Sequence, residues 1–124
     1  MLNARRLPDT LLPMDAAVVV LTTWPADRDP DALARALVGE RLAACVNVLG
    51  SMRSTYRWQG AVEQADERQL VIKTTTSRVA ALEARLREMH PYEVPELLVL
   101  PVTGGSEDYL RWVRESAQVS PRSS

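Results

Sequence analysis

The only histidine of the chain, His90, stands in the segment HPYE, between a run typical of a helix and a run typical of a strand. Tyr92 and Glu93 follow it in a segment that we expect to be extended, where a phenol and a carboxylate can converge with the imidazole. An imidazole and a carboxylate oxygen form a partial site for a divalent metal such as copper or zinc. The site is partial because zinc prefers four ligands and this stretch supplies about two. Alternatively, His90 is a structural residue that interacts with the dipole at a helix C-terminus.

Cys45, the only cysteine, lies in the apolar run LAACVNVL and is expected to be a buried small hydrophobe. A catalytic dyad of Cys45 and His90 would need a thiolate-stabilising environment and an oxyanion hole. The sequence indicates neither, and it contains no phosphate-binding loop, CxxC pair, HExxH or GxSxG motif. We therefore predict no catalytic residue and expect that the protein is not an enzyme.

A second candidate site combines Lys73 with aromatic side chains. Lys73 interrupts the apolar run LVIK, and it is interpreted either as an edge residue that reaches solvent or as a cation that recognises an anionic ligand. Tyr56 and Trp58 share one face near the tip of a predicted hairpin. Aromatic residues are enriched in interface cores, so these two are expected at an interface. In the ligand-site alternative they line a cleft with Lys73 and Tyr92.

The elements that position these residues follow from the spacing of apolar residues. The order is that of an α+β, ferredoxin-like βαββαβ sandwich with an extended β-hairpin and an extra C-terminal helix. The charged run at 66–68, after the hairpin turn, is interpreted as a solvated stretch. The sequence predicts strands at 16–23, on both sides of Gln59-Gly60 and at 96–102, and helices at 31–41, before Pro91 and after Ser106.

Length and charge bound the class of protein. We expect a flexible N-terminal extension at 1–14, a single domain at 15–118 and a flexible tail at 119–124. A net charge of −1 argues against a nucleic-acid partner, which needs a basic face. No apolar run has the length of a signal peptide or of a membrane span, so we predict a cytoplasmic protein without a membrane partner.

The strands VVVL, LVI and LLVL do not alternate apolar with polar residues. An antiparallel sheet that carries helices on one side normally alternates, because its other face meets water. Both faces of these strands are therefore expected to be buried. In a chain this short, another copy of the chain is the economical cover, and we predict an oligomer.

The segments ERLAACVN, YRWQG, IKTT and HPYEVPE, in this order, resemble the divalent-cation tolerance protein family, CutA, over residues 18–113. The resemblance implies a cytoplasmic homotrimer whose long hairpins wrap neighbouring subunits. It also implies a link to tolerance of copper and other divalent cations. The trimer is similar to that of the nitrogen-regulatory signal-transduction proteins, which by analogy places a small ligand in the clefts between subunits.

Carried over residue by residue, the resemblance makes His90 the expected metal ligand, with Glu93 or Cys45 contributing, including across a subunit boundary. Thr22 and Met89 stand where some metal-binding members have a cysteine and a second histidine, so copper binding should be weak. No organic cofactor is expected. The alternative function is a signalling or interaction module that binds a small anionic ligand in the intersubunit cleft through Lys73.

Overall fold

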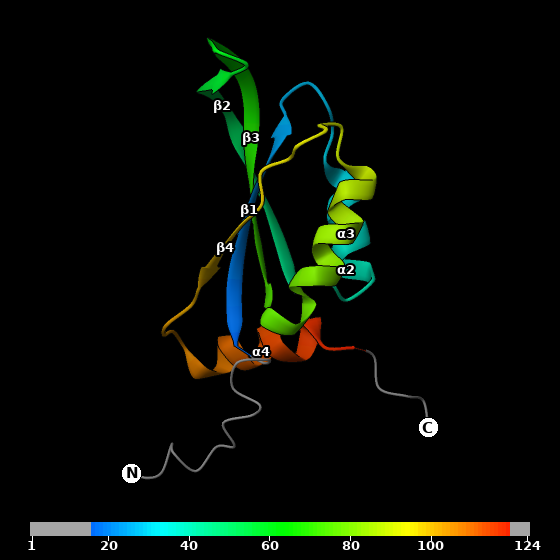
Figure 1. Cartoon of the computed structure of the whole chain (residues 1–124). Coiled ribbons are helices and arrows are strands. Elements are labelled where there is room, and N and C mark those ends of the chain that lie inside the picture. The colour runs from blue at the N-terminus through cyan, green and yellow to red at the C-terminus, as the bar shows by residue number, and fades with distance from the viewer. Residues whose placement is uncertain (1–15, 120–124) are drawn as a thin grey trace.

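The computed structural model describes residues 16–119, so the extension predicted at 1–14 and the tail beyond residue 119 lie outside the described residues. The strands form one antiparallel sheet in the order β2-β3-β1-β4 (Figure 1), which confirms the predicted α+β, ferredoxin-like arrangement. The elements are β1 (Ala17–Pro25), α2 (Asp31–Gly39), β2 (Cys45–Trp58), β3 (Ala61–Thr75), the 3-10 helix η2 (Thr76–Arg78), α3 (Val79–Met89), β4 (Leu98–Pro101) and α4 (Glu107–Ala117).

Helices α2 and α3 cover one side of the sheet, which we call the first face (Figure 1). Alternate residues of the strands point to this face, because side chains in a strand alternate with a period of two. They pack against leucines that recur every four residues along each helix. This core contains Val18, Val20, Leu33, Leu37, Leu70, Ile72, Leu82 and Leu86.

The helix ends differ slightly from the sequence prediction. Helix α2 stops at Gly39 rather than at Arg41, because Arg41 takes the left-handed conformation with φ at 61°. Its first residue is Asp31, whose N–H donates to the Asp29 carboxylate at 2.9 Å, although Asp29 lies one position outside the cap. Ser106 caps α4 as predicted and accepts a hydrogen bond from the N–H of Tyr109 at 3.3 Å.

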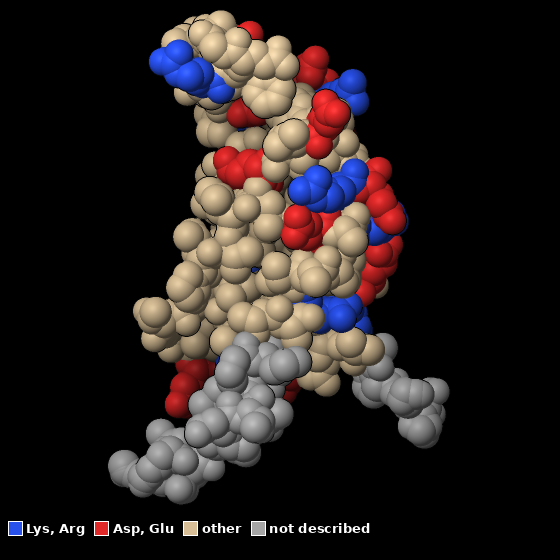
Figure 2. Space-filling model, in the orientation of Figure 1, with Lys and Arg blue, Asp and Glu red and all other residues tan. Residues whose placement is uncertain are grey.

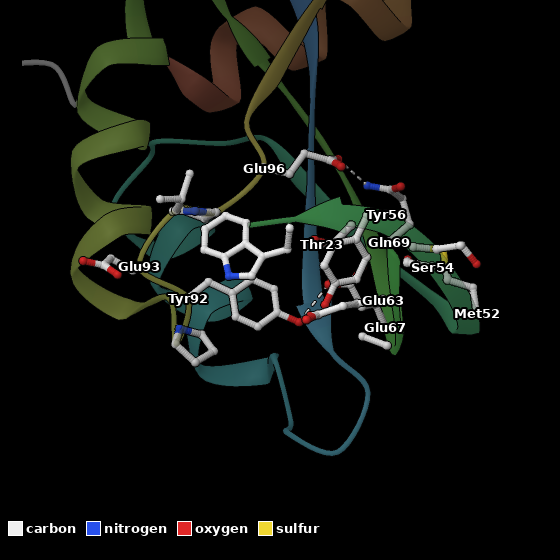
Figure 3. A pocket seen from close by; sticks show the side chains of 16 residues that line it. Thr23, Met52, Ser54, Tyr56, Glu63, Glu67, Gln69, Tyr92, Glu93 and Glu96 are labelled. Carbon is white, nitrogen blue, oxygen red and sulfur yellow. Dashed lines mark hydrogen bonds between the residues drawn. The ribbon is translucent and has the colours of Figure 1, made fainter. Parts of the chain in front are cut away.

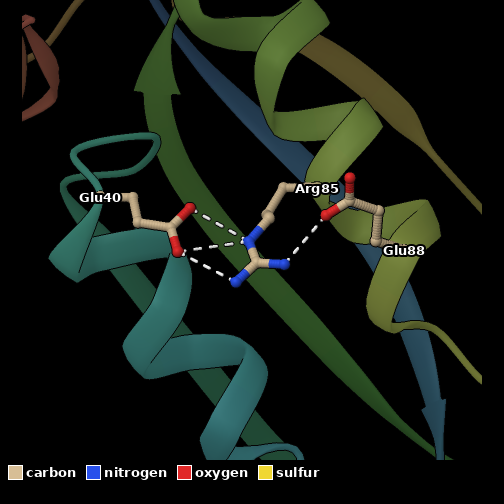
Figure 4. Close-up of polar contacts among 3 residues, drawn as sticks. All are labelled: Glu40, Arg85 and Glu88. Carbon is tan, nitrogen blue, oxygen red and sulfur yellow. Dashed lines mark hydrogen bonds and ion pairs between the residues drawn. The ribbon is translucent and has the colours of Figure 1, made fainter.

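An arginine joins the two covering helices on their outer side. The guanidinium of Arg85 on α3 donates to the carboxylate of Glu40, which follows α2, at 3.0 Å, and to Glu88 at 2.9 Å (Figure 4). The side chains are solvent-accessible, so this contact fixes the relative position of α2 and α3 more than it adds stability.

Among the described residues, α4 covers one end of the opposite side of the sheet, the second face, where Val113 packs on Ala17 and Ala44. Apolar residues remain exposed elsewhere on this face: Leu98 is 53% exposed and Leu100 is 45% exposed. Figure 2 shows a largely uncharged surface over β1 and β4. The strands that were predicted to be apolar on both faces therefore leave an apolar surface in the single chain.

Strands β2 and β3 form a long hairpin that extends beyond the helices (Figure 1). Gln59 and Gly60 at its turn both have positive φ, 50° and 84°, as a tight hairpin turn requires. A bulge between Val48 and Ser51 adds one residue to β2 relative to β3. Because the bulge reverses the alternation, the residues from Met52 to Trp58 with even numbers point to the second face.

Within residues 16–119, no helix has the length and apolar character needed to cross a membrane.

Candidate functional site

A groove of about 940 Å³ lies between the second face of the hairpin and the segment that follows α3. One wall comes from alternate residues of β2 and β3, and the other comes from residues 91–96 (Figure 3). We call it the acidic groove. Its lining consists of Thr23, Met52, Ser54, Thr55, Tyr56, Trp58, Glu63, Ala65, Glu67, Gln69, Pro91, Tyr92, Glu93, Val94, Pro95 and Glu96.

The charge of the lining is entirely negative. Glu63, Glu67, Glu93 and Glu96 line the acidic groove, and no lysine, arginine or histidine does so among the described residues. None of the four glutamates forms an ion pair within residues 16–119. Carboxylates that line a concave surface concentrate a negative potential there, so the groove attracts cations and repels anions.

Glu67 is the most buried of the four, with 8% of its surface exposed. Its position on β3 faces Met52 on β2 and Pro25 on β1. The hydroxyl of Tyr92 donates to Glu67 Oε2 at 2.7 Å (Figure 3). A buried carboxylate costs free energy unless hydrogen bonds or a counter-charge balance it. For Glu67 that hydroxyl is the hydrogen-bond donor that the described residues supply.

Tyr92 stays protonated and keeps this donor in place. Burial raises the pKa of the Tyr92 phenol well above its usual value, and the hydrogen bond and negative charge of Glu67 raise the pKa further. The phenol therefore acts as a fixed hydrogen-bond donor across the physiological pH range.

His90 is buried next to the pair of Glu67 and Tyr92 and contacts the backbone of Tyr92. Its Nδ1 accepts from the N–H of Tyr92 at 3.0 Å, and its Nε2 lies 2.7 Å from the carbonyl oxygen of Thr23. A backbone N–H only donates and a carbonyl only accepts, so Nε2 carries the proton and the imidazole is neutral. Burial lowers the pKa of His90, although the Thr23 carbonyl and the Glu67 carboxylate oppose this effect. His90 thus holds the start of the segment 91–96 against β1.

A ring cluster fixes the imidazole beside two aromatic side chains. The Trp24 ring packs edge-on against His90 at 4.9 Å between centroids, and the Tyr92 ring lies tilted against it at the same distance, 4.9 Å. At the far end of the segment, Gln69 Nε2 donates to the carbonyl of Thr22 at 2.7 Å and to Glu96 at 3.0 Å. Both ends of the wall are therefore tied to the sheet.

Comparison with known proteins places the chain in a family. The model of the CutA1 divalent ion tolerance protein family matches residues 18–116. The chain belongs to the CutA1 family. The divalent-cation tolerance protein CutA of Pectobacterium atrosepticum is 50% identical over 104 residues, 84% of this chain and 94% of the relative. The protein of the same name from Thermus thermophilus is 47% identical over 98 residues, 79% of this chain and 95% of the relative.

Solved CutA1 structures share the fold. The divalent cation tolerance protein of Thermus thermophilus matches with a TM-score of 0.79 at 45% identity, over 82% of this chain and 99% of its own. CutA1 from Oryza sativa matches with a TM-score of 0.81 at 37% identity, over 87% of this chain and 99% of its own.

The metal ligands expected from the sequence do not meet within one chain of this CutA1 family member. Cys45 lies opposite Lys73, which lies opposite Val19, whereas His90 bonds to Thr23, about 13 Å further along β1. The carboxylate of Glu93 points away from the Tyr92 hydroxyl (Figure 3). We expected Glu93 to lie beside His90 and Tyr92. In the structure, the carboxylate that bonds to the Tyr92 phenol is that of Glu67, and Glu93 lies elsewhere. No group of three or more His, Cys, Asp or Glu residues within 16–119 is arranged to hold a metal ion.

The two positions at which this CutA1 chain departs from some metal-binding members also lie outside the groove. Thr22 is fully buried on the first face, where its hydroxyl has no hydrogen-bond partner among the described residues. Met89 packs against the core.

The predicted cleft residues divide into two places. Tyr56, Trp58 and Tyr92 line the acidic groove together. Lys73 does not, because it stands six residues from Glu67 along β3, a distance of about 20 Å for a strand. Its Nζ instead lies 5.9 Å from the centroid of the Tyr109 ring on α4. The single chain therefore does not bring Lys73 next to these aromatic residues, and their meeting in a cleft between subunits stays a prediction.

Glu67 is the candidate site residue that sequence reasoning missed, since it was assigned to a solvated stretch. Counting in steps of two from the buried Leu70 places residue 67 away from the first face, on the side of Gln69. That signal was available from the sequence. The cover that residues 91–96 give to Glu67 was not, because it depends on the tertiary contact of Tyr92.

Proposed function

We propose that this protein is a cytoplasmic, non-enzymatic divalent-cation tolerance protein that binds a divalent cation weakly in the acidic groove. The observation that carries the proposal is Glu67, a buried carboxylate with no ion-pair partner among the described residues, in a groove with three more glutamates. The names of the relatives, divalent-cation tolerance proteins, agree with a cation as the ligand.

The donors of the groove fit a cation that keeps part of its hydration shell. Carboxylates suit hard divalent cations, whereas copper favours imidazole and thiolate ligands. Glu67 Oε2 already accepts from Tyr92, so its other oxygen is the one available to a cation. Copper binding through His90 requires one of the two hydrogen bonds of the imidazole to break, which lowers the affinity. Both routes give weak binding.

The non-enzymatic part of the proposal is carried over from the sequence, which contains no phosphate-binding loop, CxxC pair, HExxH or GxSxG motif.

The homotrimer is proposed from the second face. Its exposed leucines on β4, Leu98 and Leu100, would meet water in an isolated chain, and another copy of the chain would remove them from water. A neighbouring subunit is then also able to add a ligand to the acidic groove.

The alternative, a small anion held by Lys73 in a cleft between subunits, concerns a different place in the molecule. Lys73 lies outside the acidic groove of the single chain, and the four carboxylates of that groove repel an anion.

Calorimetric titration with Mn²⁺ and Cu²⁺ tests the proposal on the wild-type protein, Glu67→Gln and His90→Gln. Glu93→Gln is the matched control, since it removes a groove carboxylate that points away from Glu67. Light scattering confirms the same assembly for all four proteins. We expect Mn²⁺ affinity to fall at least tenfold in Glu67→Gln and to change little in Glu93→Gln. Equal Mn²⁺ binding by wild type and Glu67→Gln would overturn the groove as the site, and loss of Cu²⁺ binding only in His90→Gln would make the imidazole the ligand.

A further inference from the structure

Three aromatic rings line the acidic groove, and a hydrated metal ion would form no coordination bond to them. Tyr56 and Trp58 are 41% and 46% exposed at the hairpin, and Tyr92 faces them from the opposite wall. The faces of such rings attract organic cations. The lining therefore combines carboxylates with aromatic rings, which suits an organic cation better than a metal ion.

The carboxylates are spaced along the groove rather than gathered at a point. Glu63 lies opposite Tyr56, and Glu67 lies opposite Met52, in the same hairpin register. Four residues of strand separate the two carboxylates, about 13 Å at the usual rise per residue. No three carboxylates, imidazoles or thiols within residues 16–119 gather at one point, so a metal ion in the groove would have few direct protein ligands. A ligand with several positive charges, spaced along an apolar chain, matches this arrangement better than a point charge does.

We propose that the acidic groove binds a linear aliphatic polyamine. One ammonium group meets the buried carboxylate of Glu67, and another meets Glu63. The methylene chain between them lies along Met52 and Tyr56, as the stems of lysine side chains lie on apolar surfaces. The ammonium group at Glu63 lies beside the ring of Tyr56, which is opposite Glu63, and beside the ring of Trp58, which is one strand step further toward the turn. The inference rests on the proposed function in one respect, because both occupants use Glu67, and a divalent cation and a polyamine therefore compete for the groove.

Calorimetric titration with spermidine, on the full chain in its native assembly, tests the inference. Trp58→Leu removes a ring of the groove, and Trp112→Leu is the matched control, because Trp112 on α4 is 44% exposed but lies outside the lining. We expect saturable binding by the wild type and a loss of at least tenfold in affinity in Glu67→Gln. Trp58→Leu should weaken spermidine about threefold to tenfold, and Trp112→Leu should bind as the wild type does.

The Mn²⁺ titration separates this inference from the proposed function. Trp58→Leu should leave Mn²⁺ affinity unchanged, since a metal ion does not use the ring. Spermidine that fails to bind the wild type, while Mn²⁺ binds through Glu67, would overturn the polyamine and leave the proposed function standing. If spermidine binds through Glu67 and Trp58 but Mn²⁺ does not bind at all, the polyamine inference stands and the proposed function is overturned.

Two further outcomes would also overturn the inference. An uncharged linear diol that binds as tightly as spermidine would show that the groove recognises apolar chains. Equal effects of Trp58→Leu and Trp112→Leu would show that the ring at the groove is not involved. If Trp58→Leu changes the assembly, Tyr56→Leu takes its place in the same titration.

Discussion

The hydrogen bond between Tyr92 and Glu67 allows a test at the scale of one residue. Tyr92→Phe removes the donor and leaves a buried carboxylate oxygen without it. We expect the free energy of unfolding to fall by about 1–3 kcal/mol, the cost of an unsatisfied buried group. Tyr109→Phe is the control, because the exposed Tyr109 has no such bond to a buried group, and it should change stability little. Urea unfolding at one protomer concentration measures both, and equal values would contradict the role of Tyr92.

His90 gives a pH dependence whose sign follows from its lowered pKa. The unfolded chain binds a proton near pH 6.5, whereas the folded protein binds it only at lower pH. Stability from this group is therefore fully present above a pH of about 6.5 and is lost as the pH falls below that value. The chain has one histidine, so no other imidazole titrates in this range.

The measurement is urea unfolding of wild type and His90→Gln between pH 7.5 and 5.5. The wild type should lose more stability than the variant over this range. Parallel curves would show that the imidazole is not held neutral in the folded protein.

Residue types alone predicted part of the candidate site. His90 at a helix end before Pro91, and Tyr56, Trp58 and Tyr92 as cleft residues, could be read from helix periodicity and from the position of aromatic side chains. Glu67 could not be recognised as buried, since its cover comes from a distant segment. Nor could the use of both imidazole nitrogens, because Thr23 becomes the partner of His90 only in the folded sheet.

At the scale of elements, the hairpin turn is the most sensitive position. Gly60 has φ at 84°, a region in which a side chain is strained. We expect Gly60→Ala to lower the free energy of unfolding by about 1–2 kcal/mol. Gly39→Ala is the control: its added Cβ meets nothing within 4 Å and its φ is not positive, so it should be neutral or slightly stabilising. Thermal unfolding of the two variants at equal concentration checks this, and a destabilised Gly39→Ala with a neutral Gly60→Ala would contradict it.

Element order and type followed from apolar spacing, including the turn at Gln59-Gly60 and the cap at Ser106. The bulge at Val48–Ser51 was not predicted, although Gly50 within it is a residue type that often marks a bulge in a strand. The bulge matters because it sets which residues of β2 face Glu67. Strand β4 is shorter than the predicted 96–102, since its pairing with β1 runs only from Leu98 to Pro101.

At the scale of the whole molecule, the second face decides assembly. Leu98 is 53% exposed in the single chain, so Leu98→Asp keeps its charge hydrated in an isolated subunit. In a trimer that covers this face the charge would be buried, at a cost of about 3–5 kcal/mol for an unpaired ion. We expect Leu98→Asp to be a folded monomer by light scattering, while Val38→Asp on α2 remains a trimer. A monomeric wild type, or a trimeric Leu98→Asp, would contradict the proposed assembly.

The most direct test of the central claim locates a cation in the molecule. Substoichiometric Mn²⁺ broadens the nuclear magnetic resonance signals of nearby amides, so a backbone spectrum reports where the ion binds. A cation in the acidic groove should broaden the amide signals of Glu67 and Tyr92 and leave those of Cys45 and Lys73 sharp. Broadening at Cys45 and Lys73, with sharp signals around Glu67, would show that the acidic groove is not the cation site.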